Sequence, residues 1–352
     1  MRKLFIELDQ IIDKVDFDNI WNGFTRYDFA LYDEECVYLK NAIIPRDNRF
    51  LGNTAIEYDD AYIAIWHIEN PSSEDTEVLA ANLVHEMFHA YQKEKGESRF
   101  PSDLKMLDYP YSEENIAIKY SENLLLVRAF LAQDIYEKES FLSRFMSARK
   151  YRERLFGEII KQEYFSETVE GMAEYVGSMA LKQISPSKYA SRIEGYKENL
   201  QAFDESFFDI RRKLYYTGAV YCITLSDADI DFFHSVGSTE RSLFDITSDN
   251  ISAERPGMEI DGHILSASIN QYLGNKKQIL DEYLSSHNDE VLIDSFICGY
   301  DPMNMIKMEN EILCNNFVML MKKGEDEPIF IQGPVLVRLK KGSINEVISY
   351  VK

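Results

Sequence analysis

Hydrophobic and polar positions along the chain change their spacing three times. Over the first 25 residues, apolar side chains recur at steps of three and four, which predicts a helix with one apolar side. Residues 27–40 and 54–68 are rich in tyrosine and β-branched residues with partial alternation, and turn residues separate the two stretches. We therefore expect a helix followed by a small antiparallel sheet, whose last strand covers residues 60–68.

From about residue 79 the spacing is that of helices. A loop with two prolines at residues 96–110 interrupts it, and Ser112 is a suitable N-cap for the helices that follow. Pro186 is expected to end the last of these helices, which covers about residues 166–183. One further helix is then expected over residues 189–214, with an apolar continuation to residue 225.

After about residue 236 the composition changes again, and alternating apolar residues follow one more helix at residues 270–286. The expected strands are residues 291–298, 312–321, 328–332 and 335–339. Residues 344–351 fit either a short helix or an edge strand. The domains expected from these changes are residues 1–235, made of residues 1–95 and residues 96–235, and a C-terminal α/β segment at residues 236–352.

The strongest chemical signal is the motif H-E-x-x-H, which lies in a stretch that is apolar at helical spacing. Side chains four residues apart lie one above the other on a helix, so His85 and His89 can point two imidazoles at one ion. Glu86 lies one step round, where it can act on a water bound to that ion, as in zinc hydrolases. Chance occurrence in an ordinary helix is the alternative, but these side chains would be costly to bury without an ion.

A zinc enzyme needs a third protein ligand, which has to come from another helix. Glu167, Glu170 and Glu174 are spaced at i, i+3 and i+7, and therefore share one side of a predicted helix. Gly171 and Ala173 are small enough to let that helix approach another closely. A row of three acids is ordinarily a solvated helix face, but the apolar residues around these three leave little room for exposure.

The segments H-E-M-F-H and V-E-G-M-A-E-Y-V together resemble the gluzincin metallopeptidases, which include the gluzincin aminopeptidases and the wider peptidase-MA-like group. The resemblance implies an α+β, zincin-like fold, in which a small antiparallel sheet and the active-site helix face a helical subdomain. It implies one Zn²⁺ per chain, with the ligands His85, His89 and Glu170. Glu86 would be the general base, Glu174 would hold a ligand histidine by its other nitrogen, and Glu167 is the fallback ligand.

The resemblance extends to Leu214–Val220, which is similar to a Y-x-x-G-x-x segment downstream of the zinc site in those peptidases. There a tyrosine hydroxyl donates a hydrogen bond to the developing oxyanion. Tyr215 matches the spacing of this segment, and Tyr216 is the second candidate for the donor. For both tyrosines the alternative is a role in core packing. His234 and His263 are further candidates for a second donor, each with a purely structural role as the alternative.

Three features depart from the family pattern. The gap of 81 residues between His89 and Glu170 is far wider than in the aminopeptidases and leaves room for two additional helices. The G-x-M-E-N segment that those enzymes place before the zinc helix is absent, and Glu57 is only a loose substitute for anchoring a substrate amine. The resemblance covers roughly residues 50–225 and assigns no role to the C-terminal segment.

Composition narrows the class of partner. The 352 residues carry a net charge of −22, which opposes binding to nucleic acid or to anionic membranes. No stretch reaches the length of a membrane span, and acids interrupt the N-terminal residues before a signal sequence could form. The four cysteines are scattered without a C-x-x-C pair, which is typical of reduced thiols in a cytoplasmic protein.

Together these patterns predict a cytoplasmic zinc metallopeptidase that acts on a peptide or protein substrate. We expect the strand at Tyr62–Ile68 to align the substrate by backbone pairing beside the cleft. The alternatives are an inactive zincin-fold protein that binds or regulates a partner, and a zinc hydrolase of a non-peptide amide. The sequence leaves substrate preference, endo- or exopeptidase action and oligomeric state open.

Overall fold

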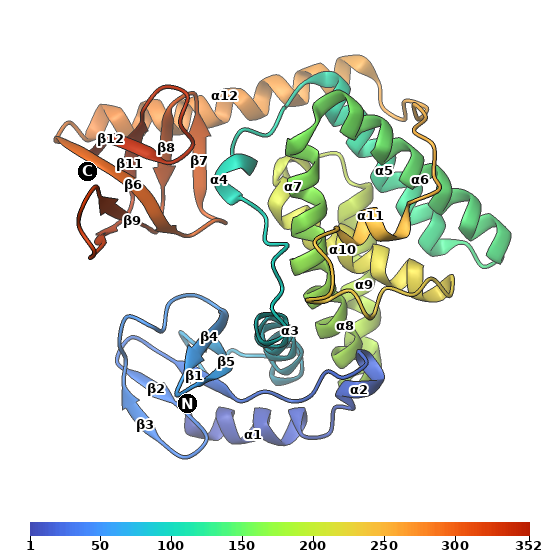
Figure 1. The fold of residues 1–352 in the computed structure, drawn as a ribbon, viewed down its shortest axis with the longest axis horizontal. Helices are drawn as coiled ribbons and strands as arrows, with labels where there is room; N and C mark the ends of the chain where they lie inside the picture. The colour runs from blue at the N-terminus through green and yellow to red at the C-terminus, as the bar shows by residue number, and fades with distance from the viewer.

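The computed structural model describes residues 1–352 as three regions that differ in secondary structure. Figure 1 shows a five-stranded sheet with its helices at the N-terminal end, a group of helices in the middle of the chain and a seven-stranded sheet at the C-terminal end. The chain is therefore a mixed α+β protein, as the sequence predicts. None of its helices combines the length and the apolar character needed to cross a membrane.

The N-terminal region places two helices beside a sheet of strand order β3-β2-β1-β5-β4. Its elements are α1 (Arg2–Ile12), α2 (Phe17–Ile20), β1 (Phe29–Tyr32), β2 (Cys36–Tyr38), β3 (Ile43–Pro45), β4 (Thr54–Tyr58) and β5 (Ala61–His67). β1 and β5 run parallel, while the other neighbouring strands are antiparallel. The prediction of a purely antiparallel sheet is wrong at this pair, because the β4–β5 hairpin returns the chain beside β1 in the same direction.

The strand expected beside the cleft, Tyr62–Ile68, is internal to this sheet. β5 has β1 on one side and β4 on the other, so its backbone groups are already paired. Asp59 and Asp60 form the two-residue turn between β4 and β5, with φ values of 50° and 64°, as tight hairpin turns require. β4 pairs with the edge of β5 that faces away from β1. The free edge on this side of the sheet therefore belongs to β4.

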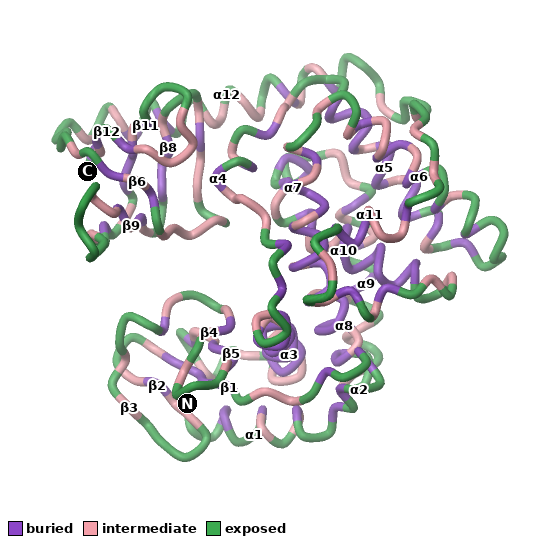
Figure 2. The backbone as a smooth tube through the Cα atoms, viewed as in Figure 1, coloured by how far each residue is buried: buried purple, intermediate pink, exposed green.

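Helix α3 (Thr76–Glu94) lies between this sheet and the helical region (Figure 1). Asp75 caps its first turn by accepting hydrogen bonds from the backbone N–H groups of Glu77 and Val78, both at 3.2 Å. The apolar side chains of α3 belong to the largest hydrophobic core, and Figure 2 shows that the helix is buried over much of its length. A helix packed on both sides is a rigid base for side chains that face a cleft.

The helical region consists of α-helices and two short segments of another helix type. Its elements are α4 (Asp103–Met106), α5 (Glu113–Leu131), α6 (Ile135–Phe156), α7 (Glu158–Ser166), the π-helical turn η1 (Glu167–Gly171), α8 (Met172–Ile184), α9 (Pro186–Gln201), the 3-10 helix η2 (Glu205–Phe208), α10 (Ile210–Asp227) and α11 (Leu243–Thr247). The continuous helix expected over residues 189–225 is wrong, because Asp209 starts a new helix by accepting from the N–H of Arg212. Pro186 follows the end of α8, as expected, and begins α9, where no N–H donor is needed.

The C-terminal region consists of one long helix and a seven-stranded antiparallel sheet of order β10-β9-β6-β12-β11-β8-β7. Its elements are α12 (Gly262–Ser286), β6 (Glu290–Tyr300), β7 (Met305–Met308), β8 (Glu311–Cys314), β9 (Phe317–Lys322), β10 (Ile329–Gln332), β11 (Val335–Leu339) and β12 (Glu346–Val351). α12 runs from the helical region to this sheet along the top of Figure 1.

Two predictions for the C-terminal region need correction. The single strand expected at residues 312–321 is two strands, β8 and β9, separated at Asn315 and Asn316. Residues 344–351 contain β12, which is neither a helix nor an edge strand but lies in the middle of the sheet between β6 and β11. Pairing with distant strands decided both outcomes, and local alternation does not report such pairing.

Candidate metal centre

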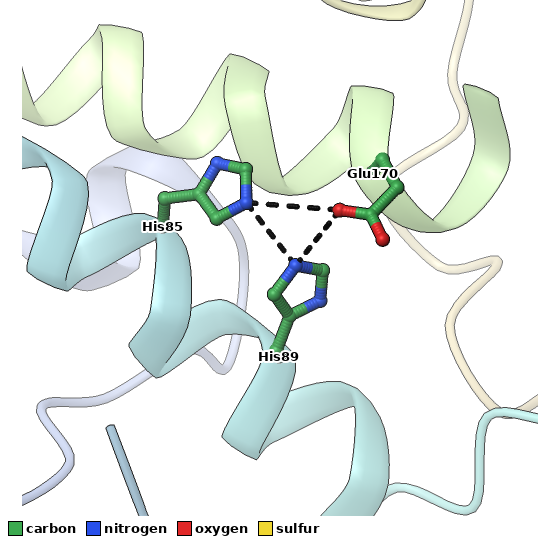
Figure 3. Close-up of side chains that lie close together, drawn as sticks. All are labelled: His85, His89 and Glu170. Atoms are coloured by element: carbon green, nitrogen blue, oxygen red, sulfur yellow. Dashed lines mark hydrogen bonds and ion pairs between the residues drawn. The ribbon is translucent and has the colours of Figure 1, made fainter. Parts of the chain in front are cut away.

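Three potential ligand atoms converge where α3 faces η1. His85 Nε2 and His89 Nε2 lie 3.1 Å apart, because the two residues are one turn apart on α3. Glu170 Oε2 lies 3.1 Å from His89 Nε2 and 3.8 Å from His85 Nε2. Figure 3 shows the three side chains pointing toward one another, the two histidines from one helix and the glutamate from another. This group could hold a metal ion.

The hydrogen-bond partner of Nδ1 in each histidine determines the tautomer, and thereby whether Nε2 carries a lone pair. His85 Nδ1 lies 2.9 Å from Glu174 Oε2, and a carboxylate accepts, so Nδ1 carries the proton. His89 Nδ1 lies 2.8 Å from the side-chain oxygen of Gln92, whose amide nitrogen donates to the carbonyl oxygen of Val169 at 3.0 Å. In the neutral imidazoles both Nε2 atoms therefore present lone pairs to each other and to the Glu170 carboxylate.

Three electron-pair donors so close together require a positive charge between them. Burial lowers the pKa of His85, but the neighbouring carboxylates of Glu170 and Glu174 outweigh this effect and raise its pKa to about 10. Without a metal, a proton on His85 is thus one possible charge, and a metal ion would replace it. Two imidazole nitrogens and one carboxylate oxygen form a donor set that zinc accepts in catalytic sites, so the residues fit this ion.

The π-helical turn η1 decides which of the three glutamates reaches the histidines. Glu170 and Glu174 face α3, whereas Glu167 is buried on another side and receives two hydrogen bonds from Arg149, at 2.6 and 2.5 Å. Gly171 lies against Gly218 so closely that a Cβ on Gly171 would stand 2.5 Å from the Gly218 Cα. Close approach of η1 to α10 and the Arg149 pair together fix the turn. Glu167, the fallback ligand, lies outside the cluster.

Glu86 lies beside the two histidines and lines the same cleft. Its side chain is buried, with a relative exposure of only 7%. Burial raises the pKa of Glu86, although the charges of His85 and His89 act in the opposite direction. A carboxylate with a raised pKa beside a metal position is suited to accept and return a proton.

The two candidate tyrosines have different surroundings. Tyr215 lines the cleft, and its ring lies parallel to that of His85, at an interplanar angle of 6° and a centroid distance of 6.1 Å. Burial and the charge of Glu170 raise the pKa of Tyr215, so its hydroxyl remains a donor at neutral pH. Tyr216 instead stacks on Tyr196, with centroids 4.8 Å apart, and is absent from the cleft lining.

Three other candidates lie away from the centre. Glu57 is an exposed residue of β4, His234 is exposed beside Asp231, and His263 is exposed at the start of α12. None of the three lines the cleft. In this arrangement they make no contribution to the chemistry of the cluster.

Sequence reasoning missed two residues at the centre. Gln92 orients His89. The sequence signal for this contact is that Gln92 follows His89 by three residues on the same predicted helix, a spacing at which two side chains can meet. Arg211 lines the cleft, is paired with Asp103, and places its Nη2 atom 3.9 Å from Glu170 Oε1. Arg211 precedes Tyr215 by four residues on α10, so the two side chains share one side of that helix.

The cleft over the cluster has a volume of about 790 Å³ and three walls. One wall comes from the N-terminal sheet and its loops, one from α3, η1 and α10, and one from the C-terminal sheet. The residues of the C-terminal wall are Tyr300, Asp301, Pro302, Met303, Asn304, Asn316, Phe317, Phe330 and Gln332. The C-terminal region, to which the sequence assigned no chemistry, therefore lines the same cavity as the three potential metal ligands.

Comparison with protein-family models, with curated proteins and with solved structures found no match. The class of site is thus defined by its own geometry, as a candidate metal centre of two histidines and one glutamate at the base of a cleft.

Proposed function

We propose that the protein is a zinc-dependent metallopeptidase of the gluzincin type, with a zincin-like arrangement of sheet, active-site helix and helical partner. The observation that carries this proposal is the convergence of His85, His89 and Glu170 at one point, with Glu86 beside them in the same cleft. The resemblance of the two motifs to those peptidases supports the same reading. A peptide or protein chain is the proposed substrate.

In this mechanism each residue of the site has one task. A zinc ion held by the three ligands would polarise the scissile carbonyl and lower the pKa of a bound water. Glu86 accepts the proton of the attacking water and passes it to the leaving amine. Tyr215 donates a hydrogen bond to the developing oxyanion. Glu174 and Gln92 hold the two imidazoles in the tautomer that leaves Nε2 free.

The sheet offers a way to align an extended substrate. Thr54 belongs to the free edge strand β4 and lines the cleft. Unpaired backbone groups on an edge strand can pair with a peptide. In the proposal β4 therefore takes the role that the sequence suggested for Tyr62–Ile68.

The test measures metal content and hydrolysis on the same samples. Elemental analysis of the wild type should find about one zinc per chain, and a degenerate peptide pool should be cleaved. Glu86→Gln should keep the metal and lower kcat by roughly 10²–10⁴-fold. Glu77→Gln is the matched control, because Glu77 lies on the same helix but pairs with Lys188 at 2.7 Å outside the cleft.

The outcomes separate the proposal from its rivals. Absence of metal, or unchanged hydrolysis in Glu86→Gln, would overturn it. Cleavage of simple amides but not of peptides would indicate a zinc hydrolase of another amide. Bound metal with no hydrolysis of either substrate would indicate a protein that binds or regulates a partner.

A further inference from the structure

Asp301 is the acidic centre of the C-terminal wall of the cleft. Its Oδ1 atom accepts from the backbone N–H of Met303 at 3.0 Å. Its Oδ2 atom accepts from the side-chain amides of Asn304 and Asn316, at 2.7 and 2.6 Å. All three partners are neutral, so these contacts hold the carboxylate in place without neutralising its charge.

The other charged side chains of the cleft already have partners. Glu34 pairs with Arg46 at 2.8 Å and lies 3.3 Å from His67, and Arg211 pairs with Asp103. Glu86 and Glu170 belong to the metal centre. Asp301 is therefore the carboxylate of this cleft that has no cationic partner and no place in the proposed mechanism.

The amides around Asp301 are oriented by it. A carboxylate only accepts hydrogen bonds, so the NH₂ groups of Asn304 and Asn316 must face it and their carbonyl oxygens must turn away. Gln332 donates its own NH₂ group to the backbone carbonyl oxygen of Asn316 at 3.0 Å, so the side-chain oxygen of Gln332 is also left free. The side-chain oxygens of these three cleft-lining amides are thus free to accept hydrogen bonds from a ligand.

Two aromatic rings complete the wall. Phe317 and Phe330 stack with their centroids 5.4 Å apart and their planes at 23°. Phe330 is 46% exposed, although it is a large apolar residue. The face of an exposed phenylalanine ring attracts a cation, and also packs against the methylene groups of a long side chain.

A carboxylate without a counter-ion, free amide oxygens and an aromatic pair with one exposed ring share one chemical preference. Each favours a positively charged group with N–H donors on an aliphatic stem. A purely apolar side chain would cover Asp301 without replacing its hydrogen bonds to water, and an acidic side chain would be repelled. From this convergence we infer that the C-terminal wall is a subsite for a lysine or arginine side chain of the peptide substrate, an inference that rests on the proposed function.

The test measures binding separately from hydrolysis, using the metal-loaded Glu86→Gln protein. Two fluorescent peptide pools with degenerate flanks are compared by anisotropy, one with lysine and one with norleucine at the central position. The lysine pool should bind about tenfold more tightly. Added to this background, Asp301→Asn should remove the preference, and Phe330→Ala should reduce it several-fold. Asp326→Asn, at an exposed aspartate outside the cleft lining, should leave the preference unchanged.

Each outcome gives a decision on the subsite. Equal binding of the two pools, or no binding of either, overturns it. A preference that survives both Asp301→Asn and Phe330→Ala overturns this location. If the wild type hydrolyses no peptide but the Asp301-dependent preference is present, the peptidase proposal fails and the cation subsite stands. Metal content and melting temperature of each variant confirm that an intact protein was compared.

Discussion

Two clusters of charged and ionisable side chains lie on opposite sides of the same helical turn, η1. The candidate metal centre joins His85, His89 and Glu170 at the base of the cleft. The second cluster, here called the buried ion cluster, has an exposure of 1% or less at each of its members. Its members are Lys119, Arg149, Arg152, Glu122, Glu163 and Glu167. Glu167 and Glu170 are three residues apart, yet they serve different clusters.

Charge is matched in one cluster and unmatched in the other. In the buried ion cluster three cations face three carboxylates, and Arg152 alone donates to Glu122 at 2.8 Å and to Glu163 at 2.6 and 2.9 Å. In the candidate metal centre two imidazole nitrogens and a carboxylate oxygen lie within 3.8 Å of one another, and a proton on His85 or a bound metal ion has to supply the positive charge between them. Balanced charge is typical of a structural cluster, in which loss of one partner is costly, whereas convergent acceptors are typical of a site that binds a cation.

The largest effect should come from breaking the matched cluster. Glu167→Ala leaves Arg149 buried without its partner, and should cost about 3–5 kcal/mol in the free energy of unfolding. Urea denaturation of the metal-free protein measures this loss. Glu139→Ala, at an exposed position of α6, is the control and should change stability by less than about 0.5 kcal/mol. A loss no larger than that of the control would contradict the structural role of the cluster.

Phenylalanine variants of the two neighbouring tyrosines, Tyr215 and Tyr216, should differ in kcat. Tyr215→Phe removes the hydroxyl beside the cluster and should lower kcat by roughly 10²–10³-fold. Tyr216→Phe alters a ring stacked on Tyr196 and should leave kcat close to the wild-type value. Steady-state kinetics on a cleaved peptide, with metal content measured in parallel, test the pair. Equal rates close to that of the wild type in the two variants would assign both tyrosines to packing.

Glu170→Ala should act on metal affinity. Loss of a ligand should weaken zinc binding by about a hundredfold or more, since even residues that only orient ligands contribute 10–100-fold. Competition with a chelator measures the change. The comparison with Glu167→Ala is the control, because the metal-free Glu170→Ala protein should lose less stability than Glu167→Ala. Unchanged zinc affinity would remove Glu170 from the ligand set.

The smallest effect is expected from a change at Glu174, which contacts the candidate ligand His85 but is not itself a proposed ligand. Glu174→Gln keeps an acceptor for His85 Nδ1 but removes its negative charge, and should weaken zinc binding by about tenfold. The same chelator competition applies. Glu194→Gln, on α9 and paired with Lys197 away from the cleft, should bind zinc like the wild type. If the two variants behave alike, the charge of Glu174 does not support the metal.

The motif residues could be assigned from the sequence because local geometry carries the information. Residues four apart on a helix face the same way whatever surrounds them, so the spacing of His85 and His89 pairs them independently of any tertiary contact. The choice of Glu170 over Glu167 came from the family resemblance, since an ideal helix places both glutamates on one face. The π-helical turn then separates them, and periodicity gives no sign of such a turn.

What the sequence alone determined is the alternation of sheet, helices and sheet, together with the helix that carries His85, Glu86 and His89. Tertiary structure decided the placement of β12 in the middle of its sheet, the burial of Glu167 against Arg149, and the position of Asp301 in the same cleft as the candidate metal ligands. The physical reason is the range of the interactions. Helix periodicity and N-caps act over a few residues, whereas strand order, buried ion pairs and cleft walls join residues that are tens to hundreds of positions apart.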